Sequence, residues 1–217
     1  IDSDSCKTYL RNICPKGDCL VIHDDVRNIN ISDLPEIDAF AYGFPCNDFS
    51  IVGEQIGING EYGPLYSYGV KVLNIHEPLW FFAENVGGIR SANNGLAFDL
   101  IQKDLAKAGP GYRLTTHLYK FEQYGVPQSR HRIVIIGIRD DLDIEFKVPS
   151  PTTPKGGQQM TAKEAINNPP IPEDSPNHVY TNHPKNVVER LKHIPPGENA
   201  WFDGLPEEFR LNVKGAR

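Results

Sequence analysis

Short apolar runs alternate with amphipathic stretches over the first two thirds of the chain, a pattern typical of an α/β protein. Apolar and β-branched or aromatic runs predict strands at residues 19–23, 37–42, 79–83, 112–119 and 133–138. Apolar residues at helical spacing predict helices at residues 1–12, 65–75 and 95–108. We therefore expect a doubly wound α/β fold with a mostly parallel sheet, in which residues 37–42 form a buried parallel strand.

The pattern changes near residue 149, where proline and glycine become frequent. The remaining helical candidates are residues 162–166 and 186–194. These features predict two parts, a catalytic α/β core at residues 1–148 and a connector at residues 149–217 with little core of its own. We find no internal repeat.

Composition places the chain among soluble globular proteins, with 39% hydrophobic and 23% charged residues in 217. No apolar run approaches the roughly 18 residues of a membrane span, and the first residues lack a signal-peptide layout. We expect a cytoplasmic protein without a membrane partner. The net charge of -6 argues against a basic surface over the whole molecule, but it leaves a local basic cleft open.

The four cysteines, Cys6, Cys14, Cys19 and Cys46, have spacings that fit neither a CxxC pair nor a zinc site. A disulfide framework is not expected in a chain of this size and composition, so we expect free thiols and no metal.

Cys46 stands out because it follows the predicted strand at residues 37–42 directly, in Gly43-Phe44-Pro45-Cys46. Ligands of open α/β sheets bind at the carboxyl ends of strands, so a thiol at this point is placed for chemistry. Pro45 stiffens the turn, and the oxygens of Ser50 and its neighbours can cap it. The alternative is a buried cysteine that acts as a small hydrophobic residue.

Charged residues follow other predicted strands. Asp25 follows residues 19–23, and Glu84 follows residues 79–83, although capping of a turn would explain an aspartate equally well. Arg130 and Arg132 occupy alternate positions after a Gly-Val-Pro turn, which points them to the same side of an extended chain. Two solvated surface arginines are the alternative.

The segment between Gly53 and Gly63 is rich in glycine. It predicts either a lid over the cysteine or an ordinary surface loop.

Three of these elements together resemble the cytosine carbon-5 DNA methyltransferases. The elements are Gly43-Phe44-Pro45-Cys46 with Phe49-Ser50, Glu84-Asn85-Val86, and Gln128-x-Arg130-x-Arg132. Their order and separations are similar to the family's, and the resemblance extends over residues 1–140. Residues 190–197 and 205–208 also resemble the stretch before the family's target-recognition region. The resemblance implies the Rossmann-like fold of S-adenosylmethionine-dependent methyltransferases.

The resemblance implies transfer of a methyl group from S-adenosylmethionine to carbon 5 of a cytosine flipped out of double-stranded DNA, as in restriction-modification systems. Cys46 would add as a thiolate to carbon 6, and Glu84, if burial raises its pKa, would neutralise the charge at N3. Arg130 and Arg132 would hold the ring oxygen O2 and a phosphate, and would favour the thiolate.

Other residues take supporting or cofactor roles by the same resemblance. Asn85 would help to orient the Glu84 loop, and the remaining supporting residues are Pro45, Ser50 and Gln128. The contacts of S-adenosylmethionine, and of its product S-adenosylhomocysteine, would be Ile1, Asp25, Val26, Pro45 and Leu65.

The chain departs from the family pattern at several points. The family's Gly-rich cofactor loop and its ribose-binding acidic residue would precede Ile1, and the target-recognition region would follow Arg217. Pro64 replaces a common threonine. We therefore expect the catalytic middle of an enzyme, inactive alone, whose missing segments come from a longer chain or a second subunit. A bacterial enzyme of this kind would associate with the nucleoid.

Two alternatives remain open. A tRNA cytosine methyltransferase on the same scaffold would share the catalytic residues. A catalytically silent nucleic-acid-binding subunit would keep the fold, but the joint presence of Cys46, Glu84, Arg130 and Arg132 argues against it. The DNA target sequence cannot be read from these residues, because the contacts that specify it would lie outside them.

Overall fold

The computed structural model describes residues 2–17, 19–45, 65–153, 157–176, 178–179 and 181–211. The chain divides into two compact units, Ile1–Ala165 and Ile166–Arg217, and each is considered by itself.

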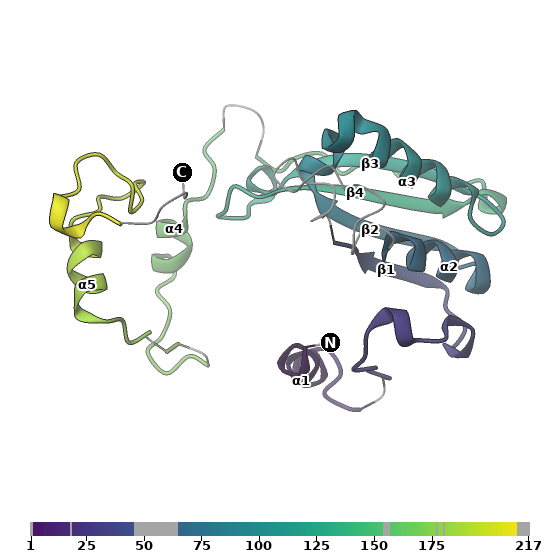
Figure 1. Ribbon diagram of the computed structural model, residues 1–217, viewed down its shortest axis with the longest axis horizontal. Helices are drawn as coiled ribbons and strands as arrows, with labels where there is room; N and C mark the ends of the chain where they lie inside the picture. The colour runs from purple at the N-terminus through teal and green to yellow at the C-terminus, as the bar shows by residue number, and fades with distance from the viewer. Residues whose placement is uncertain are drawn as a thin grey trace. The chain divides into compact units, whose positions relative to one another are not determined.

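The first unit contains a four-stranded sheet with the strand order β1-β2-β4-β3 (Figure 1). The strands are β1 (Ala39–Gly43), β2 (Trp80–Val86), β3 (Tyr112–Lys120) and β4 (His131–Arg139). β1 is parallel to β2, and β4 is antiparallel to both of its neighbours, so β1, β2 and β3 all run in the same direction. The predicted α/β class is confirmed. The sheet itself is mixed rather than mostly parallel, because β4 pairs antiparallel with both β2 and β3.

Helices α2 (Tyr66–His76) and α3 (Leu96–Lys107) follow β1 and β2 in the chain and cover one face of the sheet (Figure 1). Their apolar sides pack on alternate strand residues, which are fully buried at Phe81, Ile133 and Ile135. Side chains alternate between the two faces along a strand. The residues between the buried ones, such as Glu84 and Arg132, therefore lie on the opposite face of the sheet.

Two strand predictions need correction. Residues 19–23 form no strand, and Leu20 and Ile22 are exposed, because this segment joins no strand ladder among the described residues. β1 is an edge strand rather than a buried one, and its residues Ala39, Ala41 and Gly43 are exposed.

β2 is longer than its apolar run predicted. It continues through Glu84, Asn85 and Val86, because these residues still pair with the neighbouring strands. Pairing with β4 extends to Arg132, and pairing with β1 extends to Gly43. The Glu-Asn-Val element therefore lies within the last part of the strand rather than after it.

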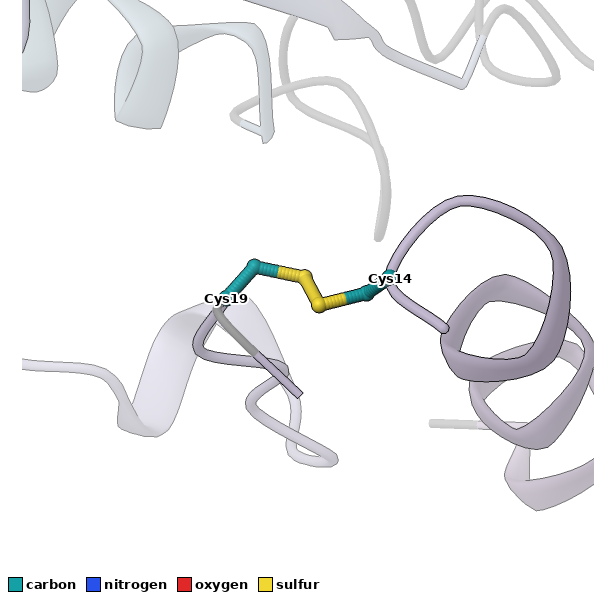
Figure 2. Close-up of a disulfide and its surroundings, with 2 residues drawn as sticks. All are labelled: Cys14 and Cys19. Atoms are coloured by element: carbon teal, nitrogen blue, oxygen red, sulfur yellow. A yellow bond between two sulfur atoms is a disulfide. The ribbon is translucent and has the colours of Figure 1, made fainter. Parts of the chain in front are cut away.

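The amino-terminal helix α1 (Ser3–Asn12) agrees with the prediction. Asp2 caps it by accepting a hydrogen bond from the backbone N–H of Ser5 at 2.6 Å. The expectation of free thiols is wrong for two cysteines, since Cys14 and Cys19 form a disulfide (Figure 2). The turn after α1 brings their Cα atoms to 6.0 Å, which is within the range of such bridges.

In the second unit, α5 (Lys185–Lys192) and the short helix η10 (Glu207–Phe209) are held by a few specific contacts. The Arg190 side chain donates to the carbonyl oxygen of Phe209 at 2.6 Å, and the Phe209 ring stacks on His193. Among the described residues of this unit, Leu205 is the buried hydrophobic side chain. Helix α4 (Ala162–Asn167) spans the division between the units, and both predicted helices of this region are confirmed.

Gly137, in the middle of β4, is required by close packing. It pairs with Phe81 in the ladder, and a Cβ atom at position 137 would overlap the Phe81 ring. Glycine generally weakens a strand. Its presence at position 137 is explained by the Phe81 ring, which occupies the space that a side chain would need.

We predict that Gly137→Ala lowers the free energy of unfolding by about 1–3 kcal/mol, because the core must shift to admit the methyl group. Denaturant unfolding would measure the change. Gly88→Ala is the control, since a Cβ there meets no described atom within 4 Å, and it should change stability by less than about 0.5 kcal/mol. Equal losses in the two variants would contradict this account of the packing.

Candidate functional site

The strand β1 ends beside the segment that carries the candidate nucleophile. Phe44 follows β1 directly, is buried, and packs against Tyr66 at the start of α2. Pro45 is half-buried, and the next two predicted residues in this loop, Cys46 and Ser50, lie outside the described residues. The structure therefore fixes the backbone that leads to Cys46.

An ion pair between Glu84 and Arg132 links β2 and β4. The Nε atom of Arg132 lies 2.7 Å from Oε1 of Glu84, with 19% of the arginine side chain and 35% of the glutamate side chain exposed. Arg132 also donates from Nη1 to the carbonyl oxygen of His131 at 2.8 Å. Glu84 is thus a paired, partly exposed carboxylate, and the sequence-based picture of a buried acid is corrected.

The second oxygen of Glu84 lies next to β1. Gly43 is the ladder partner of Glu84, and a Cβ at position 43 would be 3.6 Å from Oε2. A larger side chain would fill the space beside this oxygen, so glycine keeps it accessible from the β1 side.

Asn85 connects β2 to the backbone that follows β1. It is only 4% exposed, and its Nδ2 donates to the carbonyl oxygen of Phe44 at 3.0 Å. Its Oδ1 accepts from the backbone N–H of Val86 at 2.8 Å. Asn85 therefore fixes the chain two residues before Cys46, a contact that the sequence did not predict.

Arg130 and Gln128 are exposed residues of the turn before β4. The backbone N–H of Arg130 donates to Oε2 of Glu122 at 3.3 Å, and its carbonyl oxygen accepts from Phe121 N–H at 3.0 Å. Within the described residues, the Arg130 guanidinium forms no hydrogen bond or ion pair. The structure therefore brings Glu84 and Arg132 together and leaves the Arg130 side chain exposed to solvent.

Glu122 is a further residue that sequence reasoning missed. Its Oε1 lies 2.8 Å from Nε2 of His131, and its side chain is 12% exposed. Hydrogen bonds from backbone N–H groups, its own and that of Arg130, and from the His131 ring lower the pKa of its carboxyl. A lone glutamate before a Gly-Val-Pro turn gives no periodic signal that could have revealed this pairing.

Among the predicted cofactor residues, Asp25 caps the short helix η1 (Val26–Asn28). Its Oδ1 accepts from the backbone N–H and Nε of Arg27, and its Oδ2 accepts from Nη2 of Arg27 at 2.8 Å. These bonds lower the pKa of Asp25 to about 2, so it is ionised at neutral pH.

The other predicted cofactor residues differ in how exposed they are, and one of them is not described by the structure. Val26 is 38% exposed next to Asp25, Leu65 is half-buried just before α2, and Ile1 lies outside the described residues. No hydrogen bond or ion pair in the described ranges joins Asp25 to the Glu84–Arg132 pair.

The described residues contain no group of three or more histidine, cysteine, aspartate or glutamate side chains that could hold a metal ion. They also contain no helix that is long and apolar enough to cross a membrane.

Comparison with known proteins extends over nearly the whole chain. The family model of the C-5 cytosine-specific DNA methylases matches residues 1–216. The chain is 57% identical to the Type II methyltransferase M.BbvI of Brevibacillus brevis over 222 residues, which cover 100% of this chain and 58% of the relative. It is 35% identical to the Type II methyltransferase M.NgoFVII of Neisseria gonorrhoeae, over 97% of this chain and 56% of the relative.

A solved structure supports the fold. It is that of a protein encoded within an Escherichia coli prophage and provisionally described as a DNA modification methyltransferase, with a TM-score of 0.60 and 20% identity. The match covers 91% of this chain and 57% of that protein. The chain thus spans somewhat more than half the length of the proteins it matches. Because the family model matches residues 1–216, the chain belongs to the C-5 cytosine-specific DNA methylase family.

Proposed function

We propose that this protein transfers a methyl group from S-adenosylmethionine to carbon 5 of cytosine in double-stranded DNA. The observation that carries the proposal is the Glu84–Arg132 ion pair, which lies beside the strand end that leads to Cys46. Membership of the family and the likeness to two Type II methyltransferases support the same reaction, as part of DNA modification in the cytoplasm.

Cys46 serves as the nucleophile in this proposal. Cytosine is a poor nucleophile at carbon 5, so the thiolate first bonds to carbon 6 and the ring electrons move toward carbon 5 and N3. Carbon 5 would then take the methyl group, with S-adenosylhomocysteine as the leaving group. Loss of the proton from carbon 5 to water and release of the thiolate would restore the aromatic ring and free Cys46.

Glu84 and Arg132 act together on the ring. Arg132 holds Oε1 of Glu84, while Oε2 beside Gly43 has no hydrogen bond within the described residues. This oxygen can take up a proton from solvent and donate it to N3 as charge develops there, and the guanidinium can stabilise the charge on O2. Arg130, which is exposed before β4, is suited to a phosphate of the DNA.

Gln128 and Ser50 complete the group of supporting residues.

Extruding the base from the duplex costs a few kcal/mol of free energy, which contacts to the DNA must offset.

The residues assigned to the methyl donor fit a nucleoside. A carboxylate can accept about four hydrogen bonds, and Arg27 supplies three to Asp25, so one position on Oδ2 remains for the amino group of an adenine. The exposed Val26 offers an apolar surface beside it. Pro45, Leu65 and Ile1 would complete the contacts. S-adenosylmethionine supplies an electrophilic methyl group when it is bound.

The proposal is tested by trapping the covalent intermediate. DNA that contains 5-fluorocytosine should form a denaturation-resistant adduct with the protein that carries this sequence when S-adenosylmethionine is present, because the fluorine cannot leave as a proton would. Cys46→Ser should reduce adduct formation by roughly 10³-fold or more, whereas Cys6→Ser, in α1, should not. Absence of an adduct with the unaltered protein overturns the proposal, and an adduct with tRNA alone favours an RNA methyltransferase.

We expect Glu84→Gln to lower the rate of methyl transfer by about 10²–10³-fold, because glutamine cannot deliver a proton to N3. The affinity for DNA should change by less than about threefold. Single-turnover methylation and equilibrium DNA binding would measure the two effects, with the exposed Glu36→Gln as the control. Similar losses in rate and affinity would show that Glu84 only binds DNA.

Removal of the Asn85 amide should misplace the cysteine. Asn85→Ala leaves the Phe44 carbonyl without its donor, and we expect adduct formation on fluorinated DNA to slow about tenfold at saturating DNA. Asn74→Ala is the matched control, since Asn74 accepts from the backbone N–H of Gly109 far along the chain from Cys46. If both variants slow the reaction equally, a general loss of stability explains the result.

A further inference from the structure

The side chain of Glu122 is bonded to two consecutive residues at the start of β4. Oε2 accepts from the backbone N–H of Arg130 at 3.3 Å, and Oε1 lies 2.8 Å from Nε2 of His131. With 12% of its side chain exposed, Glu122 is the more buried partner, since His131 is 44% exposed. One carboxylate thus fixes both the backbone and a side chain in the segment that bears the two arginines.

The short helix that carries Glu122, η8 (Phe121–Tyr124), is itself firmly held. The carbonyl oxygen of Gln123 accepts from Thr153 N–H at 2.9 Å, and the Tyr124 hydroxyl donates to the carbonyl oxygen of Pro149 at 3.0 Å. The rings of Phe121 and Tyr124 both lie against Tyr119 of β3. Glu122 therefore projects from a rigid support, as a residue that positions others requires.

Three polar contacts and the covalent frame of His131 connect Glu122 with Glu84. Glu122 contacts the ring of His131, the carbonyl oxygen of His131 accepts from Nη1 of Arg132, and Nε of Arg132 pairs with Glu84. Each contact is between 2.7 and 2.8 Å long. The ring and the carbonyl oxygen belong to one residue, so a contact that holds the ring also restricts the backbone from which the carbonyl oxygen projects.

We propose that Glu122 is a positioning residue for cytosine methylation, which acts through His131 to set the orientation of Arg132 and hence of the Glu84 carboxyl. This inference rests on the function proposed above. Glu122 does not contact the base or the methyl donor. Its contribution is to keep the guanidinium aligned with Oε1, so that Oε2 stays directed to the space beside Gly43.

The test compares Glu122→Ala and Glu122→Gln in the protein that carries this sequence. We expect Glu122→Ala to slow adduct formation on 5-fluorocytosine DNA about 10- to 30-fold at saturating DNA, with the DNA affinity changed less than about threefold. Glu122→Gln should recover to within about threefold of the unaltered protein. Its amide oxygen can accept from Arg130 N–H, and its amide N–H can donate to a ring nitrogen of His131.

Tyr124→Phe is the matched control, because it removes one hydrogen bond of the same short helix that does not lead to Arg132. It should leave the rate of adduct formation within about twofold. The double variant Glu122→Ala with His131→Ala should be no slower than Glu122→Ala alone, since both residues act in one series. An equal loss of the rate of adduct formation in Tyr124→Phe overturns the inference. A slower rate in Glu122→Ala that results from weaker DNA binding also overturns it.

A second measurement does not depend on catalysis. The Nε–H group of Arg132 is hydrogen-bonded to Glu84 and gives an NMR signal that should shift or broaden in Glu122→Ala and stay unchanged in Tyr124→Phe. An unchanged signal in Glu122→Ala overturns the inference even where methylation proceeds. Absence of the adduct in the unaltered protein instead overturns the proposed function, while the NMR result still decides whether Glu122 orients Arg132.

Discussion

The ion pair between Arg132 and Glu84 is the interaction on which the proposed site depends. It crosses from β4 to β2 and joins a guanidinium and a carboxylate at 2.7 Å, on the face of the sheet opposite to α2 and α3. A charge pair that is partly exposed contributes little to stability, because water competes with it. Its importance is geometric. The pair fixes the direction of a carboxyl group that would otherwise sample several rotamers.

Two further polar contacts of the first unit lie on either side of this pair. Asn85 ties β2 to the backbone before Cys46, and Glu122 ties the turn before β4 to His131. Both side chains are well shielded from water and satisfied at each polar group that the structure describes. Enzymes gain much of their rate from groups that are held in place before the substrate arrives. Asn85 and His131 lie on strands, whereas Glu122 lies on the short helix η8, and each of them joins a strand to the backbone of a turn or loop.

The sequence predicted the fold class, the helices and four of the strands, because their apolar periodicity was strong. It failed at residues 19–23, where an apolar run joins no strand in the part of the chain that the structure describes, and Leu20 is exposed. It also ended β2 too early at residue 83, because pairing with β1 and β4 continues where hydrophobicity stops. Both errors arise from the same cause: strand formation depends on neighbours that are distant in sequence.

For the site, the motifs identified Glu84 and Arg132, and the structure brings them together. The contact of Asn85 with Phe44 and that of Glu122 with His131 could not be predicted, since they depend on the turns between strands rather than on any local pattern. The disulfide between Cys14 and Cys19 was missed for a similar reason. A turn whose course the sequence does not reveal brings the two residues close together.

The side-chain alternation of β4 has a further consequence. Arg132 and Val86 are ladder partners, and Glu84 lies two residues before Val86 on the same face. If β4 paired with β2 in a register shifted by one residue, the Arg132 side chain would face the hydrophobic core under α3. Gly137 would then no longer lie under the Phe81 ring. A misaligned molecule would thus lose its core packing and its charge pair at once. Correct assembly of the sheet and competence for chemistry are therefore inseparable in this protein.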